Sequence, residues 1–365
     1  MTWIALADHD GGDFDPRGLG RGGAFAREAE VQGLLTRGSL VLETRLSPEG
    51  RPQMLLRFGR VHPWPAELSV QAIPGGSVAL ILAQGSDMCH AVLPLAADSR
   101  TDILRITYSW DAPARWGRLA IERPESARAL SVETAPPPPL MLEDLRAMAC
   151  QPRLREMDPD LLYFAVSDAV EPLGPQPALS AHVPVATDRG YRAAGSLRRG
   201  DVVITEGEDG PEGVPVLESL SRLVPARGAF RPVRLRAPYF GLRQDIVVAP
   251  EQRLLIRGSE VEYMFGTEAV LVPARHLING TAARWEEAPQ LIRYCQLVLP
   301  GHEPLMAAGA AVESLYLGRI RRRKDALAAS LLADVPRHRL PDHARPAYPV
   351  LSPFDAITLA QNRAA

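Results

Sequence analysis

The sequence has no long hydrophobic run, few cysteines and no excess of charge of either sign. No stretch approaches the roughly 20 consecutive apolar residues of a membrane-spanning helix, so no membrane span is expected. The formal net charge of −2 excludes the strongly basic surface of a general nucleic-acid binder, and no nucleic-acid partner is expected. The first residues lack the basic segment and apolar core of a secretory signal, which makes the cytoplasm the default location. Export by a route that needs no N-terminal signal is the alternative.

The three cysteines, Cys89, Cys150 and Cys295, are an odd and scattered set. Such a set forms no disulfide framework and contains no closely spaced pair for structural zinc, so we expect three unpaired thiols. The sequence also lacks a P-loop, the GxGxxG pattern and the GxSxG pattern, which removes common signatures of nucleotide binding and of serine hydrolases. No cofactor is therefore expected.

What the sequence does contain is a long series of short alternating runs. Residues 104–110 place Leu, Ile, Tyr and Trp on one side and Arg, Thr and Ser on the other. Similar runs occur from about residue 38 to 134, separated by turn signals such as PGG and DAP. This period of two is typical of an antiparallel β-sandwich, in which two sheets bury their apolar faces against each other. We therefore predict a mainly β fold, with a jelly-roll-like sandwich over residues 1–135.

A run of four prolines follows the predicted sandwich. Proline cannot continue a β-ladder and favours extended polyproline II, which is typical of a semi-rigid linker. Leu142, Leu145 and Ala149 then repeat at helical spacing. We predict a proline-rich linker with a short helix over residues 136–175, and we expect the border between two separately folding halves to lie there.

Short strand-like runs return in the second half, and they predict an all-β domain over residues 176–320. The remaining residues, 321–365, are predicted to form a helical and extended tail. Within it, RRRKDALAASLLADV (321–335) is predicted to be a helix with a basic first turn, and PVLSPFDAITLA (349–360) is predicted to add a final strand or to pack on a neighbour.

Four segments of the second half together resemble the bacterial Hint (hedgehog/intein) family. They are VPVATDRGYRAAGSLRRGDVVIT (183–205), DIVVAPEQRLLIRG (245–258), EYMFGTEAVLVPARHLINGTAAR (262–284) and YCQLVLPGHEPLMAAGAAVESLYLG (294–318). The resemblance implies a Hint fold. In active members it also implies an acyl shift, in which a cysteine or serine attacks the preceding carbonyl and histidines act as acid and base. The first half resembles a concanavalin A/laminin-G jelly roll through ILRITYSWDAPARWGRLAIE (103–122).

Most of the residues that carry the family's chemistry are replaced in this sequence. The resemblance places the family's cysteine on Ala178, one histidine on Gln252 and another on Gln296, while His302-Glu303 does match. A methyl group cannot attack a carbonyl and a carboxamide does not titrate, so we expect no catalytic residue. The favoured interpretation is a non-enzymatic binding or structural protein with a degenerate Hint domain that has lost autoprocessing. Membership of a larger assembly is left open.

An alternative from another class is autoprocessing by Ser180. A small shift in alignment would make Ser180 a hydroxyl nucleophile, working with His302 as base. His182 lies close to it in the sequence, and we expect His182 and His276 to be structural or surface histidines. The Asn279-Gly280 pair beside His276 predicts a turn.

A further alternative is glycan binding, or binding of a protein partner, through the N-terminal sandwich. Trp64, Trp110 and Trp116 are candidates for stacking on sugar rings, although the alternation places Trp110 on the apolar face. A cluster of acidic residues near the start, Asp8, Asp10, Asp13 and Asp15, has carboxylates of the kind that bind calcium. Their spacing does not match an EF-hand loop, so a solvated acidic segment is favoured and no metal is expected.

Overall fold

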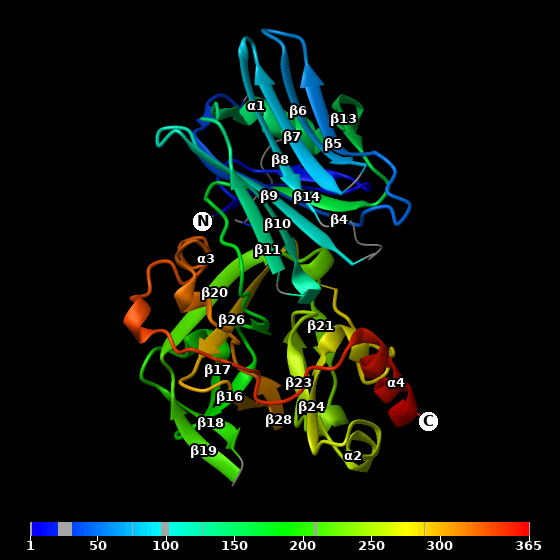
Figure 1. The fold of residues 1–365 in the computed structure, drawn as a ribbon, viewed down its shortest axis with the longest axis vertical. Coiled ribbons are helices and arrows are strands. Elements are labelled where there is room, and N and C mark those ends of the chain that lie inside the picture. The colour runs from blue at the N-terminus through cyan, green and yellow to red at the C-terminus, as the bar shows by residue number, and fades with distance from the viewer. Residues whose placement is uncertain are drawn as a thin grey trace. The chain divides into compact units, whose positions relative to one another are not determined.

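The computed structural model describes residues 2–20, 31–74, 76–95, 102–126, 128–207, 210–287 and 289–364. The chain forms two compact units, Met1–Pro172 and Leu173–Ala365 (Figure 1). Each unit is built from antiparallel β-sheets, with a few short helices, so the predicted mainly β class is confirmed. Among the described residues, no helix has the length and apolar character needed to cross a membrane.

The first unit is a β-sandwich. Its seven-stranded sheet has the order β11-β10-β9-β4-β14-β1-β2, its five-stranded sheet has the order β13-β5-β6-β7-β8, and β12 pairs with β3. The strands are β1 (Trp3–Ala7), β2 (Gly12–Phe14), β3 (Leu34–Leu35), β4 (Arg37–Thr44), β5 (Gln53–Arg60), β6 (Ala66–Ile73), β7 (Ser77–Gln84), β8 (Asp87–Pro94), β9 (Leu104–Asp111), β10 (Trp116–Arg123), β11 (Arg128–Glu133), β12 (Leu140–Met141), β13 (Arg155–Met157) and β14 (Leu161–Ser167).

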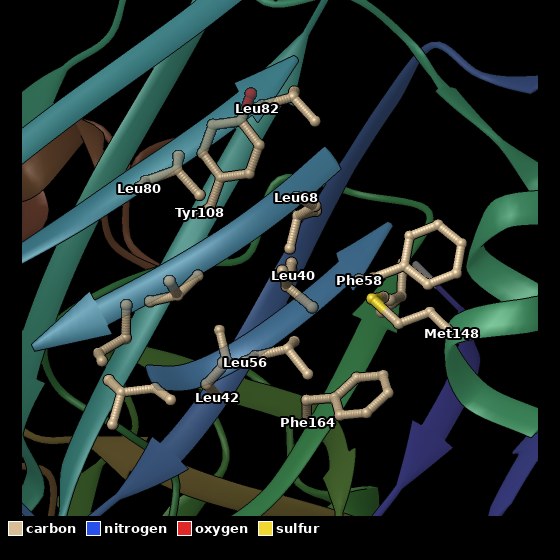
Figure 2. Packing of buried hydrophobic residues seen from close by; sticks show 14 of the residues in the cluster. Leu40, Leu42, Leu56, Phe58, Leu68, Leu80, Leu82, Tyr108, Met148 and Phe164 are labelled. Carbon is tan, nitrogen blue, oxygen red and sulfur yellow. The ribbon is translucent and has the colours of Figure 1, made fainter. Parts of the chain in front are cut away.

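The apolar faces of the two sheets form one core. Leu40 and Tyr108 from the larger sheet meet Leu56 and Leu80 from the smaller one, and all four are fully buried (Figure 2). Each fully buried leucine of this kind contributes about 1.5–3 kcal/mol relative to an exposed one. The alternation therefore predicted the inner face of the sandwich correctly, and Trp110 also belongs to it.

The opposite face of the larger sheet is polar and is nevertheless buried. Arg105 Nη2 lies 2.7 Å from Glu43 Oε1, and both side chains are almost completely inaccessible to solvent. On the same face, the hydroxyl oxygens of Ser39 and Ser109 lie 2.8 Å apart. Because these groups are paired, the cost of removing them from water is partly offset. The sequence alternation gives no sign that this polar face is covered.

Residues 136–175 are not a separate connector, which corrects the predicted linker. The expected helix is present as α1 (Leu142–Cys150), and Met148 and Ala149 on it are buried in the core of the first unit. Strand β14 lies inside the larger sheet, between β4 and β1. Helix α1 also approaches β2 closely, since a Cβ on Gly12 would come within 2.1 Å of the Ala149 carbonyl oxygen. The division between the units falls after Pro172.

The second unit contains two further sheets. The six-stranded sheet has the order β20-β26-β15-β22-β21-β25, and the other has the order β17-β16-β18-β27-β28-β23-β24 with β19 beside β18. The elements are β15 (Leu179–Ser180), β16 (Pro184–Thr187), β17 (Gly190–Ala193), β18 (Val202–Gly207), β19 (Gly210–Pro215), β20 (Glu218–Pro225), β21 (Val233–Leu235), β22 (Ile246–Val248), β23 (Arg253–Arg257), α2 (Ser259–Phe265), β24 (Ala269–Pro273), β25 (Ala283–Trp285), β26 (Leu291–Val298), β27 (Pro304–Ala307), β28 (Ala310–Glu313), α3 (Lys324–Ala328) and α4 (Pro353–Ala364).

The C-terminal segment differs in part from its prediction. The helix expected over 321–335 is only the five-residue α3. Of residues 349–360, predicted to add a strand or to pack on a neighbour, Val350 makes one β-bridge to Leu271, while residues 353–360 lie in helix α4 (red in Figure 1). The start of α4 has a clear local cause. Ser352 Oγ accepts the backbone N–H of Asp355 at 3.3 Å, and Pro353 occupies the first turn, where its missing N–H is not needed. Ala356 and Leu359 then pack into the core of the second unit.

Candidate functional site

Ala178 stands where the resemblance places a nucleophile, immediately before strand β15. Its side chain is buried in a small apolar cluster with Val224, Phe230, Ala249 and Tyr294. Its carbonyl oxygen accepts the backbone N–H of Ala249 at 2.7 Å. The position is therefore held firmly, but it presents only a methyl group, and the surroundings are those of a packed core.

Gln252 and Gln296 stand where the resemblance places histidines, and they are bonded to each other. Gln296 Nε2 donates to Gln252 Oε1 at 3.3 Å. The same Gln296 nitrogen donates to the carbonyl oxygen of Glu313 at 2.8 Å, and Gln252 Nε2 donates to that oxygen at 3.1 Å. The two side chains are 1% and 3% exposed. We call these two side chains and the Glu313 carbonyl the glutamine cluster.

The glutamine cluster is fixed by the main chain on both sides. Gln252 follows the break at Pro250 between β22 and β23, and its backbone carbonyl accepts the N–H of Ala274 at 2.8 Å. Gln296 lies within the long strand β26, opposite Leu220 of β20. A carboxamide neither gains nor loses a proton in the physiological pH range, so this arrangement supports the fold without offering a base.

His302 has a carboxylate partner, which is Glu313 and not Glu303, its neighbour in the sequence. His302 Nε2 lies 3.0 Å from Glu313 Oε1, and Arg253 Nη1 donates to the same oxygen at 2.8 Å. His302 Nδ1 accepts the backbone N–H of Ala347 at 3.0 Å. Glu313 and Arg253 lie in two of the segments that resemble the Hint family, but nothing in the sequence singled them out as site residues. They are brought to His302 only because β28 pairs with β27 and approaches β23.

Ser180 and His302 are not joined in the structure. The backbone of Ser180 pairs with Tyr294 in the β15–β26 ladder, and its side chain is largely buried. Within the part of the chain that the structure describes, Ser180 Oγ forms no hydrogen bond. His302 is occupied by Glu313 and Ala347, and His182 is exposed.

His276 is a structural histidine of the second unit. Burial, together with the neighbouring Arg275 guanidinium, lowers the pKa of His276 to about 4. Arg275 Nε donates to His276 Nε2 at 2.9 Å, so the ring acts as a neutral acceptor. The predicted turn follows it, with Gly280 at a φ of +80° and Asn279 Oδ1 accepting the N–H of Ala282 at 2.8 Å.

None of the three cysteines forms a disulfide bond, as expected. Cys295 belongs to the second unit and pairs with Leu179, the neighbour of Ala178, in the β15–β26 ladder. Burial raises its pKa above the ordinary value, so the thiol stays protonated and unreactive near neutral pH.

The acidic residues near the N-terminus form a hydrogen bond and an ion pair within their own segment. Asp8 Oδ1 accepts the N–H of Asp10 at 3.0 Å in a turn, and Asp15 pairs with Arg17 at 3.0 Å. Among the described residues, no three His, Cys, Asp or Glu side chains are grouped so that they could hold a metal ion.

One groove of the second unit lies away from the expected chemical positions. It encloses about 810 Å³ beside Glu206, Phe240, Ile256, Arg257 and Met306, and its described lining residues do not include Ala178, Gln252 or Gln296. The positions that the resemblance singles out are therefore parts of a packed interior.

Residues 177–319 match the family model of the Hint domain. No curated protein matches the chain. Among solved structures, a bacterial intein-like domain from Clostridium thermocellum is similar at 13% identity, over 38% of this chain and 99% of that one, with a TM-score of 0.29. A carbohydrate-binding module of a Ruminococcus gnavus sialidase, solved with sialyllactose, is similar at 11% identity over 37% and 78%, with a TM-score of 0.24. The LG1-3 region of the laminin alpha2 chain is similar at 10% identity over 79% and 55%, with a TM-score of 0.26.

Proposed function

We propose that the Hint domain of this protein no longer cleaves its own chain, and that the protein acts as a binding or structural protein. The observation that carries the proposal is the glutamine cluster. Two positions that would supply titratable rings instead hold carboxamides, which bond to each other and to one backbone carbonyl. The position of the nucleophile holds Ala178 in an apolar cluster.

The proposal follows from what an acyl shift requires. The reaction needs a nucleophilic atom next to the scissile carbonyl, a base that removes its proton, and an acid that protonates the leaving amide nitrogen. Ala178 supplies no lone pair, so the covalent route is lost. Acid–base help is worth about 10²–10⁴ in rate, and neither glutamine can provide it.

The alternative that uses Ser180 has less support. Its hydroxyl would need His302 as base, whereas Nε2 of His302 faces Glu313 and Nδ1 already accepts the N–H of Ala347. A serine hydroxyl without a base is a weak nucleophile near neutral pH. We therefore expect the Ser180→Ala variant to behave like the wild type in any cleavage assay.

Restoring the replaced groups tests the proposal. We would compare the wild type with Ala178→Cys alone and with the triple variant Ala178→Cys, Gln252→His, Gln296→His, each incubated with dithiothreitol at neutral pH. We expect cleavage before residue 178 in the triple variant and little in Ala178→Cys. Cleavage of the wild type to the same fragments would contradict the proposal.

We propose glycan binding by the first unit as a second function. The supporting observation is Trp64, which is 43% exposed and has the guanidinium carbon of Arg60 at 5.1 Å from its ring centroid. Such a fixed and accessible ring can stack on a sugar face. Trp110 is fully buried and cannot do so. A glycan array probed with the full chain and with Trp64→Ala tests this, and equal signals from both would count against it.

A further inference from the structure

Two buried histidines fasten the chain segment 341–348 to the second unit, and we call this segment the strap. In Figure 1 the chain after α3 crosses the second unit toward α4. His343 lies at one end of the strap. Its backbone N–H donates to Gly318 O at 3.0 Å, its Nδ1 accepts the N–H of Leu317 at 3.2 Å, and its Nε2 lies 3.2 Å from Leu299 O.

The partners of His343 define its protonation state. Nδ1 can accept a hydrogen bond from Leu317 only if it carries no proton, so the single proton is on Nε2, where it is donated to the carbonyl of Leu299. The neutral ring therefore satisfies one donor and one acceptor of the main chain. It is 3% exposed, and water cannot easily replace either bond.

His302 holds the strap four residues further along. Its Nδ1 accepts the N–H of Ala347 at 3.0 Å, so its proton is also on Nε2, which faces Glu313 at 3.0 Å. Arg253 shares that carboxylate and reduces its ability to stabilise a charged His302. Tyr316 packs edge-on against the His302 ring, with 4.9 Å between the centroids.

Three side chains that can carry a charge lie around His343. His302 lies next to it, with 5.8 Å between the ring centroids, so the two rings cannot both become charged without repulsion. Tyr316 lies at 6.2 Å. Asp342 precedes His343 in the chain, and its Oδ2 is engaged by Arg322 Nε at 2.7 Å and by Arg321 at 3.8 Å. Burial lowers the pKa of His343 by more than the charge of Asp342 raises it.

We propose that the strap is released by acid. When His343 takes up one proton from solvent at Nδ1, an acceptor becomes a donor that faces the backbone N–H of Leu317. The hydrogen bond between Leu317 and the strap is then lost, and a positive charge is left in a buried place. Residues 341–348 separate from the β-sheets, which exposes the Glu313 carboxylate beside the glutamine cluster.

The direction of the pH dependence agrees with this geometry. Burial lowers the pKa of His343 below its ordinary value, and the charge of a protonated His302 lowers it further, while the hydrogen bond to Leu299 acts in the opposite direction. A free histidine titrates near about 6.5. The stabilisation by the neutral ring is therefore complete above about pH 6.5 and is lost as the pH falls from there through the lower folded-state pKa.

Hydrogen exchange of the full chain, followed by mass spectrometry between pH 7.5 and pH 5, tests the proposal. After correction for intrinsic exchange rates, we expect protection of peptides covering the strap to fall about tenfold for each pH unit below about 6.5, for one proton taken up. Peptides from β4 and β9 in the first unit should keep their protection. Strap protection that does not change with pH, or a uniform loss over the whole chain, would overturn the proposal.

Asparagine variants separate titration from simple loss of contact. In His343→Asn and His302→Asn, the Oδ1 atom can accept the same backbone N–H but does not titrate. We expect strap protection in the double variant to be independent of pH, while His338→Asn, at an exposed histidine, keeps the wild-type behaviour. A double variant that still loses protection in acid would contradict the assignment. If the double variant does not fold, the contrast between the strap and the first unit in the wild type decides the question.

Discussion

Gln296 Nε2 lies 3.3 Å from Gln252 Oε1, and both side chains donate to the carbonyl oxygen of Glu313. The two positions therefore form one unit, and its members come from β26 and from the turn before β23. A substitution of either glutamine removes one hydrogen-bond partner from the other. This mutual dependence fixes two neutral side chains in the interior of the second unit.

The glutamine cluster should contribute measurably to stability. Replacing Gln252 by Ala removes an acceptor from Gln296 and a donor from the Glu313 carbonyl. We expect the free energy of unfolding to fall by about 1–3 kcal/mol, the range for a buried polar group left without its partner. Urea denaturation measures this, with Gln361→Ala on the exposed side of α4 as the control. Equal midpoints for the two variants would show that the cluster is energetically neutral.

The buried ion pair of the first unit should be more sensitive than a surface pair of similar geometry. Glu43→Ala leaves the buried Arg105 charge with the more distant Glu122 carboxylate at 3.9 Å, and we expect a loss of about 3 kcal/mol in the free energy of unfolding. Glu67→Ala removes an exposed pair with Arg57 at 3.0 Å and should cost about 0–1 kcal/mol. Thermal and urea unfolding compare the two, and similar losses would refute the burial argument.

His276 should titrate far below an ordinary histidine. Because burial and the Arg275 guanidinium both disfavour its charged form, NMR of the ring protons should give a midpoint near pH 4. Its contribution to stability is then complete above about pH 6.5 and is lost as the pH falls through 4. The exposed His182 in the same spectrum is the internal comparison, and a His276 midpoint near 6.5 would show that the ring is solvated.

The cap of α4 gives a prediction for the C-terminus. Ser352→Ala removes the side-chain acceptor for the Asp355 N–H and should cost about 1 kcal/mol. Leu359→Ala, in the buried face of the same helix, should cost about 2–5 kcal/mol through the cavity that it leaves. Urea unfolding checks both values, and a larger effect at Ser352 than at Leu359 would contradict this account of α4.

The strands were predictable from the sequence wherever apolar and polar residues alternate, even where both faces of the strand are buried. Leu104, Ile106 and Tyr108 alternate with polar residues, and this pattern alone identified β9 and its inner face. The helix α4 was not predicted, because the apolar residues of 349–360 indicated either a final strand or packing on a neighbour and did not specify a helix. The capping signal of Ser352, Pro353 and Asp355 was present in the sequence and would have identified the helix.

The candidate site was predictable only in part, because several of its contacts join residues that are distant in the sequence. The resemblance located Ala178, Gln252 and Gln296, but a linear pattern does not show that the two glutamines are bonded to each other. Glu313 pairs with His302 through contacts made by distant strands, and His343 is brought in by the return of the chain after α3. These partners follow from tertiary packing, and no local spacing in the sequence identifies them.

Intact mass spectrometry of the wild-type chain tests the central claim most directly. The purified protein is incubated with a thiol at neutral pH for several days and its mass is followed over time. The account predicts one species of 39.7 kDa throughout, because Ala178 offers no nucleophile and the glutamine cluster no base. Two fragments that meet immediately before residue 178, or before 180 if Ser180 attacks, would contradict it.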